Sequence, residues 1–346
     1  MMSRPTMRLA VQRWDRSAAL VDGRISLDGV MMIRAPGGRT TVEGLLSGAF
    51  DAAEIPLARY VFWKEQGEPV TAVPVFTDRL FTYPYMYTRS DTGMANLADL
   101  RGRRVAVTPG YYSTPMFWHR AILEEECGIL PAEVDWYATG AESDARMRLP
   151  EGVSVTIRRA PILGLELLLD GTVDCLLAAR TPYIPPGERH RVRRLVSDAH
   201  ARQREWYRRT GFFPILHLVV IRDDAFAKRP EFGEEICRAY DAAKRAAYHI
   251  LQDERMTALP FMRAFLDETT ELCGDDPWPF GLDRNRAVLV RFLECAQSQG
   301  LTRRRLTVEE LFDERAAGYQ FTSRMVPGSI VGFAEGGWAD ESVGLE

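Results

Sequence analysis

The sequence lacks the cysteine pattern of a disulfide framework or a zinc site. Its five cysteines are odd in number, none forms a Cys-x-x-Cys, and they are spread over positions 127, 175, 237, 273 and 295. Small secreted domains are held together by paired cysteines, and structural zinc sites need closely spaced ligands. We therefore predict small buried thiols in a reducing compartment.

A long hydrophobic run and a secretory leader are also missing. No apolar stretch approaches the roughly 18 residues of a membrane span. The first residues, MMSRPTMRLAVQRWDR, lack the apolar centre of a signal peptide. We expect a cytoplasmic protein without a membrane partner, the alternative being that a leader has been removed.

The sequence has no excess of positive charge for binding nucleic acid. Its 44 Lys and Arg residues against 48 Asp and Glu residues give a net charge of −4. No global positive field therefore favours nucleic acid as a partner. Local basic runs at 189–194 and 303–305 are interpreted as solvated surface. A repeat of roughly 20–50 residues is absent, so the sequence does not indicate a solenoid.

What the chain does contain is two successive α/β rhythms, in 346 residues that suffice for two cores. Strand-like runs at 7–12 and 29–34 alternate with helical spacing, and the rhythm restarts after residue 96. Such alternation predicts mixed sheets flanked by helices. We predict two lobes, the second inserted into the first, with a ligand cleft between them. The predicted lobes are residues 1–90 plus 200–346, and residues 91–199.

The segment 206–222, WYRRTGFFPILHLVVIR, is central to this prediction. Its part 214–221 is β-branched and apolar, as is typical of a buried central strand. A buried polar group without a partner is costly, so His217 is expected to be either hydrogen-bonded or chemically active. The aromatic, cationic and hydroxyl side chains at 206–210 suggest the floor of a site for an anionic aromatic ligand.

A second candidate for anion binding precedes the helical segment 116–126. Ser113 or Thr114 can cap that helix, with Pro115 at its first position. A helix N-terminus offers free backbone N–H groups and the positive end of the helix dipole, which together bind anions. An ordinary cap with nothing bound is the alternative.

Cationic and aromatic residues at predicted loops and strand ends complete the candidate site. The carboxylate-clamp candidates are Arg16, Arg79, Arg146 and Arg180. Guanidinium groups bind carboxylates bidentately, and at least two of the four are expected to face the cleft. A surface or inter-lobe ion pair is the alternative for each of them. Tyr207, Phe213 and Trp278 are predicted to hold an aromatic ring, or else to pack in the core.

Several segments resemble one known family. The most specific are YRRTGFFPILH at 207–217 and GDDPWPFG at 274–281. Weaker ones are WDR at 14–16, DGR at 22–24, PVFTDRLF at 74–81 and LADLRGRRV at 97–105, with Trp118 and Arg120. Together they resemble the 4,5-dihydroxyphthalate decarboxylase family, whose fold is periplasmic-binding-protein-like and related to the type 2 solute-binding proteins. The wording of YYSTP at 111–115 and the segment after residue 321 depart from the family pattern.

The resemblance implies a decarboxylase of a dihydroxylated aromatic acid. Losing CO2 from a ring needs an acid near the ring carbon, cations for the carboxylates and an acceptor for the phenol proton. We assign the proton donor to His217, because an imidazole with an ordinary pKa near 6.5 can hold and give a proton. Asp15 is predicted to orient a hydroxyl or the imidazole, or else to cap a helix. The chemistry requires no metal or cofactor, and the sequence contains neither HExxH nor GxGxxG.

Two other functions stay open at the level of the sequence. One is a solute receptor or sensor that binds a small carboxylate in the same cleft without catalysis. The other is a different enzyme on this fold, such as a biosynthetic lyase of small carboxylates. The fold alone does not discriminate between them, whereas the missing leader favours an enzyme. The sequence is also compatible with a homo-oligomer.

Overall fold

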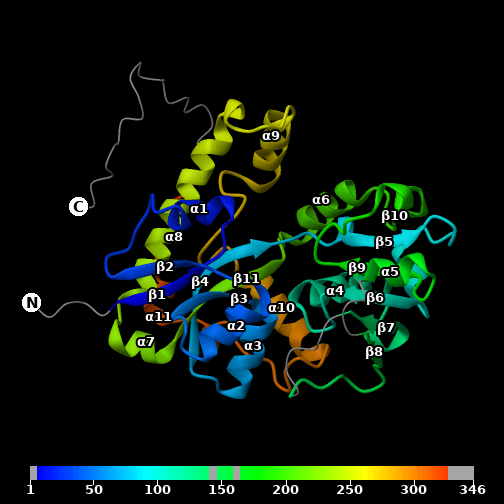
Figure 1. Ribbon diagram of the computed structural model, residues 1–346, viewed down its shortest axis with the longest axis horizontal. Coiled ribbons are helices and arrows are strands. Elements are labelled where there is room, and N and C mark those ends of the chain that lie inside the picture. The colour runs from blue at the N-terminus through cyan, green and yellow to red at the C-terminus, as the bar shows by residue number, and fades with distance from the viewer. Residues whose placement is uncertain (1–5, 140–145, 159–163, 326–346) are drawn as a thin grey trace, which may run out of the picture.

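The computed structural model describes residues 6–139, 146–158 and 164–325. Within these ranges the chain forms two mixed sheets, each flanked by helices (Figure 1). The α/β architecture predicted from the sequence is thereby confirmed. We call the two sheets sheet A, in lobe 1, and sheet B, in lobe 2.

Within the described residues, sheet A has five strands in the order β2-β1-β3-β11-β4. They are β1 (Met7–Val11), β2 (Val30–Arg34), β3 (Ala52–Pro56), β4 (Val70–Arg79) and β11 (Ile215–Arg222). Strand β1 is parallel to β2 and β3, whereas β11 is antiparallel to β3 and β4. The predicted buried strand is confirmed as β11, which lies inside the sheet between β3 and β4 and in which residues 218–221 are fully buried.

Sheet B has six strands in the described ranges, in the order β10-β5-β9-β6-β7-β8. They are β5 (Met86–Arg89), β6 (Arg104–Thr108), β7 (Asp135–Ala138), β8 (Val155–Ile157), β9 (Cys175–Ala178) and β10 (Val192–Arg194). The four strands β9, β6, β7 and β8 are parallel. Their carboxyl ends therefore lie at one edge of the sheet.

Helices cover both sheets. In chain order the α-helices are α1 (Asp15–Val21), α2 (Gly38–Leu46), α3 (Leu57–Gln66), α4 (Thr114–Cys127), α5 (Gly164–Leu169), α6 (Ala199–Thr210), α7 (Asp223–Lys228), α8 (Phe232–Gln252), α9 (Met262–Cys273), α10 (Arg286–Ser298) and α11 (Glu314–Ala317). Short 3-10 helices are η1 (Tyr83–Tyr85), η2 (Leu97–Leu100), η3 (Pro131–Glu133), η4 (Pro186–Arg191), η5 (Glu254–Met256) and η6 (Glu309–Leu311).

The chain crosses from sheet A to sheet B after Arg79 and returns before Ile215. Strand β5 pairs with β9 and β10. Its residues 86–89 are thus part of sheet B, although the predicted first lobe extended to residue 90. We therefore propose that the first lobe boundary lies before Met86.

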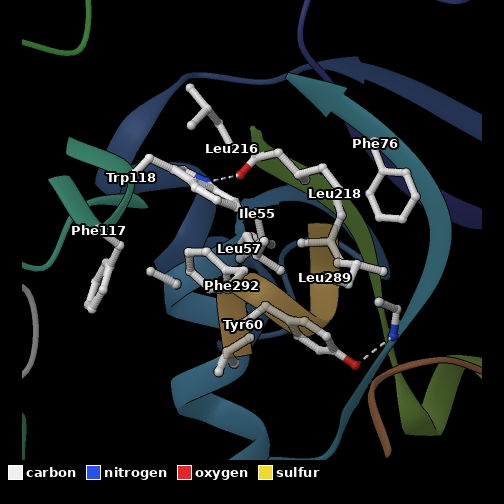
Figure 2. Packing of buried hydrophobic residues seen from close by; sticks show 14 of the residues in the cluster. Ile55, Leu57, Tyr60, Phe76, Phe117, Trp118, Leu216, Leu218, Leu289 and Phe292 are labelled. Atoms are coloured by element: carbon white, nitrogen blue, oxygen red, sulfur yellow. Dashed lines mark hydrogen bonds between the residues drawn. The ribbon is translucent and has the colours of Figure 1, made fainter. Parts of the chain in front are cut away.

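One hydrophobic core runs through both lobes. Tyr60 of α3, Leu216 of β11, Phe292 of α10 and Trp118 of α4 belong to the same cluster (Figure 2). The Trp118 indole N–H donates to the carbonyl oxygen of Ile215 across 3.0 Å. Because protein interiors are close-packed, a core shared in this way resists separation of the lobes.

Candidate active site

The carboxyl edges of the two sheets face each other. Helix α3 follows β3 directly, and α4 begins at Thr114 shortly after β6. The backbone N–H of Ala58 donates to Thr114 Oγ1 at 3.1 Å, so the two helix N-termini are in contact. Ligands of open α/β sheets bind outside the carboxyl ends of the strands. This edge is therefore where a functional site is expected.

His217 lies at this edge. In the sheet it pairs with Pro56, the last residue of β3, and with Asp78 of β4. Its side chain is half-buried, and Nδ1 has no hydrogen-bond partner among the described residues. Burial lowers the pKa of His217, the Asp78 carboxylate raises it and the Arg16 cation lowers it, with a net decrease. The imidazole is therefore neutral near pH 7, and its protonated form is a comparatively strong acid.

Asp78 belongs to this group, although the sequence pattern does not single it out. Its carboxylate is half-buried, and Oδ1 lies 4.0 Å from Nη2 of Arg16. The ladder between β11 and β4 is irregular on both sides of the His217–Asp78 pair. The negative charge of Asp78 raises the pKa of both the Arg16 guanidinium and the His217 imidazole. The signal that could have identified it is the pairing of segments 70–79 and 214–221.

Arg16 and Asp15 lie at the start of α1. Asp15 Oδ1 accepts hydrogen bonds from the Arg16 backbone N–H at 2.7 Å and from Nη1 at 2.9 Å. Nε and Nη2 of Arg16 both donate to the carbonyl oxygen of Thr77. Of the five N–H donors of a guanidinium, two are left for a ligand. Burial lowers the pKa of Arg16, while Asp15 and Asp78 raise it, and an arginine remains charged under such conditions.

An aromatic wall, formed by Phe81, Phe213 and Trp278, flanks Arg16. The guanidinium carbon lies 3.7 Å from the Trp278 ring centroid. Trp278 meets Phe213 edge-on with centroids 5.2 Å apart, and Phe213 stacks on Phe81 at 4.6 Å. Tyr207, the third predicted aromatic, contacts the edge of Phe81 at 6.0 Å. The structure thus brings two of the three predicted aromatic residues to Arg16.

The GDDPWPFG segment fixes the orientation of the Trp278 ring. Buried Asp276 accepts hydrogen bonds from Lys244 Nζ at 2.9 Å and from the Tyr248 hydroxyl at 2.7 Å, both on α8. The Tyr248 oxygen accepts from the Trp278 backbone N–H at 3.0 Å. The Trp278 indole N–H donates to the carbonyl oxygen of Phe76 at 2.8 Å. Burial lowers the pKa of Lys244 to about 8, against the opposing effect of Asp276.

A buried carboxyl group forms hydrogen bonds with the residues that precede α1. Glu54 of β3 accepts hydrogen bonds from the Gln12 backbone at 3.0 Å, the Trp14 indole at 3.0 Å and the Tyr240 hydroxyl at 3.1 Å. Burial raises the pKa of Glu54 to about 7, and these hydrogen bonds lower it in part. This residue was not predicted. A glutamate within the otherwise apolar strand sequence AAEIP was the available signal.

Next to Arg16 the structure has a cavity of about 360 Å³. Its wall includes four of the predicted residues, Asp15, Arg16, Phe213 and Trp278, and continues over α6, α8 and α9. His217 does not line it. Arg16 therefore borders the cavity and also acts electrostatically on the His217 imidazole.

Arg79 has a different place from the one predicted for a clamp residue. It is 4% exposed, and its guanidinium donates to the carbonyl oxygens of Phe213 and Pro279 at 2.8 Å each and to Asn285 Oδ1. Burial lowers its pKa to about 9. A ligand cannot replace these three protein acceptors without disrupting the loop. We therefore remove Arg79 from the proposed clamp.

Arg146 is also engaged elsewhere, whereas Arg180 is available. Arg146 Nη1 donates to Glu68 at 2.9 Å. Glu68 follows the C-terminal end of α3, about 15 Å from the helix start at the cleft edge. Arg180 follows β9 at the carboxyl edge of sheet B, and it is exposed without a hydrogen bond or ion pair to the described residues. Of the two, Arg180 fits a clamp.

The hydroxyls at the start of α4 serve the fold. Ser113 occupies the N-cap position, but its Oγ donates to the carbonyl oxygen of Gly110 at 2.8 Å and does not cap the helix. Thr114 is the first helical residue, so Pro115 is the second and not the first as predicted. Thr114 is buried, and its Oγ1 is used by Ala58. Both hydroxyls therefore form hydrogen bonds within the protein.

Other features predicted from composition concern the whole chain. The five cysteines are free thiols. The described residues contain no group of three or more His, Cys, Asp and Glu side chains arranged to hold a metal ion. In the same part of the chain, no helix combines the length and apolar character needed to cross a bilayer.

Two α/β lobes with facing carboxyl edges define a periplasmic-binding-protein-like fold. The periplasmic aliphatic sulphonate-binding protein of Escherichia coli superposes with a TM-score of 0.54 and 14% identity, covering 90% of this chain and 98% of that one. The alkanesulfonate-binding protein of Xanthomonas axonopodis pv. citri, bound to MOPS, gives a TM-score of 0.50 and 14% identity, covering 90% and 99%. At these identities the likeness shows the fold alone, and it confirms the predicted architecture.

Within this fold, the chain belongs to the 4,5-dihydroxyphthalate decarboxylase family. A curated relative of that name from Comamonas testosteroni is 33% identical over 322 residues, covering 90% of this chain and 97% of the relative. Another from Pseudomonas putida is 30% identical over 220 residues, covering 61% and 84%. A scan of family models finds no match. The resemblance inferred from the sequence segments is therefore confirmed.

Proposed function

We propose that the protein is a cofactor-independent carboxy-lyase that removes CO2 from a dihydroxylated aromatic acid of the 4,5-dihydroxyphthalate type. Family membership supports the reaction class, because both curated relatives are named for it. The observation that carries the proposal in the structure is the group of Arg16, Asp78 and His217 at the carboxyl edge of sheet A. This group combines a cation that can bind a carboxylate, Arg16, with a proton donor, His217.

In the proposed reaction Arg16 holds a carboxylate with its two remaining N–H donors, and Arg180 adds a second cation from lobe 2. The imidazolium of His217 donates its proton to the ring carbon that bears the departing carboxylate. The hydroxyl para to that carbon delocalises the positive charge. The C–C electron pair then returns to the ring as CO2 leaves. From 4,5-dihydroxyphthalate this gives 3,4-dihydroxybenzoate and CO2, and His217 regains its proton from water.

The surroundings of His217 suit an acid of this kind. Burial makes the imidazolium a stronger acid, and the Asp78 carboxylate keeps the charged form accessible. An anionic substrate adds further negative charge and raises the pKa of His217 when it binds. We propose that Asp15 braces Arg16 through their two hydrogen bonds and orients a substrate hydroxyl.

The test is turnover of 4,5-dihydroxyphthalate by the purified protein, followed as CO2 release. His217→Gln should lower kcat by about 10²–10⁴-fold, because general acid catalysis is worth that much, and leave KM within a few-fold. His190→Gln, at an exposed position of η4, is the matched control and should keep full activity. Unchanged turnover by His217→Gln would remove this residue from the mechanism.

A second candidate is a binding protein that uses the same cleft without catalysis. The likeness of the fold to sulphonate-binding proteins favours it. Isothermal titration calorimetry with 4,5-dihydroxyphthalate distinguishes the two. Micromolar binding without CO2 release would support the receptor, whereas turnover supports the enzyme.

We further propose that the protein acts in the cytoplasm on a small aromatic carboxylate, with no nucleic-acid or membrane partner. Its free cysteines suit a reducing compartment. Cell fractionation with an antibody against the protein tests the location. Light scattering after gel filtration decides between a monomer and the homo-oligomer that the sequence allows.

A further inference from the structure

The cavity beside Arg16 is larger than the proposed reaction at His217 needs. Its volume is about 360 Å³, more than twice the roughly 150 Å³ that holds a benzene molecule in an engineered protein cavity. His217 and Asp78 do not line it, whereas Arg16 does. If the substrate ring reacts at His217 and one of its carboxyl groups contacts Arg16, the cavity remains available for a substituent attached to that carboxyl group.

The far wall of the cavity is apolar. Leu251 of α8 and Met262, Leu266 and Leu272 of α9 line it. Phe265 also lines it and is 54% exposed, so the cavity has a mouth at the surface beside α9. Side chains of this kind bind hydrocarbon and offer no partner for a second anionic group.

Charged residues at the rim pair with one another, although Arg204 Nε has no hydrogen-bond partner among the described residues. Glu268 of α9 forms ion pairs with Arg204 of α6 and with His200, whose Nε2 lies 3.4 Å from Glu268 Oε2. These contacts hold α9 against α6 and keep its apolar face directed at the cavity. Residues of α6, α8 and α9 line this space. In Figure 1, α9 lies near the end of α8, and α6 lies beside β5 and β10 of sheet B.

We propose that the preferred substrate carries an apolar arm next to the carboxyl group that Arg16 binds, and that this arm occupies the cavity beneath α9. The inference rests on the proposed decarboxylase function and refines its substrate class. A monoalkyl ester of 4,5-dihydroxyphthalate has the required chemistry. Its free carboxylate leaves as CO2, its ester carbonyl accepts from Arg16, and its alkyl chain extends into the cavity.

The proposal is tested by comparing the monomethyl and mono-n-butyl esters as substrates. Each buried methylene is worth about a factor of four in affinity, so three additional methylenes give at most about 60-fold. Because the cavity has an open mouth, we expect kcat/KM for the butyl ester to exceed that for the methyl ester by at least about tenfold.

A matched pair of variants on α9 locates the arm. Thr269 lines the cavity, and its hydroxyl bonds only within its own helix, to the carbonyl oxygen of Phe265, among the hydrogen bonds of the described residues. Thr269→Phe should fill the space and reduce the butyl-over-methyl ratio to about twofold or less. Ala264→Phe, at an exposed position of α9 that does not line the cavity, should keep the wild-type ratio.

The outcomes separate this inference from the proposed function. Turnover of 4,5-dihydroxyphthalate without a preference between the esters refutes the apolar arm and leaves the decarboxylase standing. Turnover of none of the three compounds refutes the decarboxylase. In that case calorimetry tests whether the cavity binds an apolar arm. The inference requires the wild type to bind the butyl ester at least about tenfold more tightly than the methyl ester, and Thr269→Phe to lack this preference. A preference that survives in Thr269→Phe also refutes it.

Discussion

Replacing Arg16 by lysine tests the part of the site that the structure describes most fully. The wild-type guanidinium uses three N–H donors on Thr77 and Asp15 and keeps two for a ligand. A lysine keeps the charge and can still reach one of the protein oxygens, but it lacks the planar fork that binds a carboxylate bidentately. We therefore expect Arg16→Lys to fold and to bind substrate poorly.

The size of the effect follows from the hydrogen bonds lost. A hydrogen bond to a charged group contributes about 1.5–3 kcal/mol, which corresponds to an increase in KM of about 10- to 150-fold. The smaller energies of solvent-exposed ion pairs do not apply to this group, because the Arg16 side chain is only 12% exposed. Initial rates of CO2 release across a substrate series measure KM, and urea unfolding of the same samples verifies the fold.

Arg146→Lys is the control for that experiment. Arg146 belongs to the same set of predicted clamp residues, but it pairs with Glu68 away from the cleft edge. An exposed ion pair contributes little, so KM should stay within about twofold of the wild-type value. Equal increases in KM for both variants, or a wild-type KM for Arg16→Lys, would refute the assignment of Arg16.

Three more predictions concern the neighbours of this site. Asp78→Asn removes a charge that raises the pKa of His217. Because kcat/KM needs the imidazolium, its decrease with rising pH should begin at a lower pH in this variant than in the wild type. A pH–rate profile that does not shift would contradict this. The Glu54 carboxyl has a pKa of about 7 when folded against 4.5 ordinarily. Its own contribution to stability is therefore fully present below about pH 4.5, and roughly 3 kcal/mol of it is lost as pH rises through 7. Urea titrations at several pH values should show that decline in the wild type and not in Glu54→Gln. Lys244→Met removes one cation from the buried Asp276, which keeps the Tyr248 hydroxyl, Arg284 and Arg324 as partners, and should cost about 1.5–3 kcal/mol in urea unfolding, whereas Lys228→Met, in an exposed pair, should be nearly neutral.

The sheets and the central strand could be predicted because they depend on local patterns. Apolar β-branched runs identified β11 and its histidine, and the repeated α/β alternation indicated mixed sheets flanked by helices. The basic segment that forms α6, in contrast, was described only by its side-chain types. Its helix is highly charged, and it ends where Gly211 adopts a positive φ of 68°.

The clamp arginines were harder to predict, because their partners lie far away in sequence. Arg79 donates to carbonyl oxygens 134 and 200 residues distant. A backbone carbonyl carries no residue signature, so nothing in the sequence distinguished this buried structural arginine from a ligand-binding one. Asp78 was missed for a related reason. Its proximity to Arg16 and His217 depends on which strands become neighbours, and composition does not report that.

The shared core between the lobes bears on how molecules enter and leave. Solute receptors of this architecture commonly close around their cargo by a hinge motion. Here Trp118, 1% exposed and bonded across the interface, would have to be pulled into water for the lobes to part. We therefore expect a rigid body whose traffic passes through the mouth beneath α9. In such a molecule, a scaffold shared with hinge-closing receptors stays rigid, and the substrate enters through an opening at the surface.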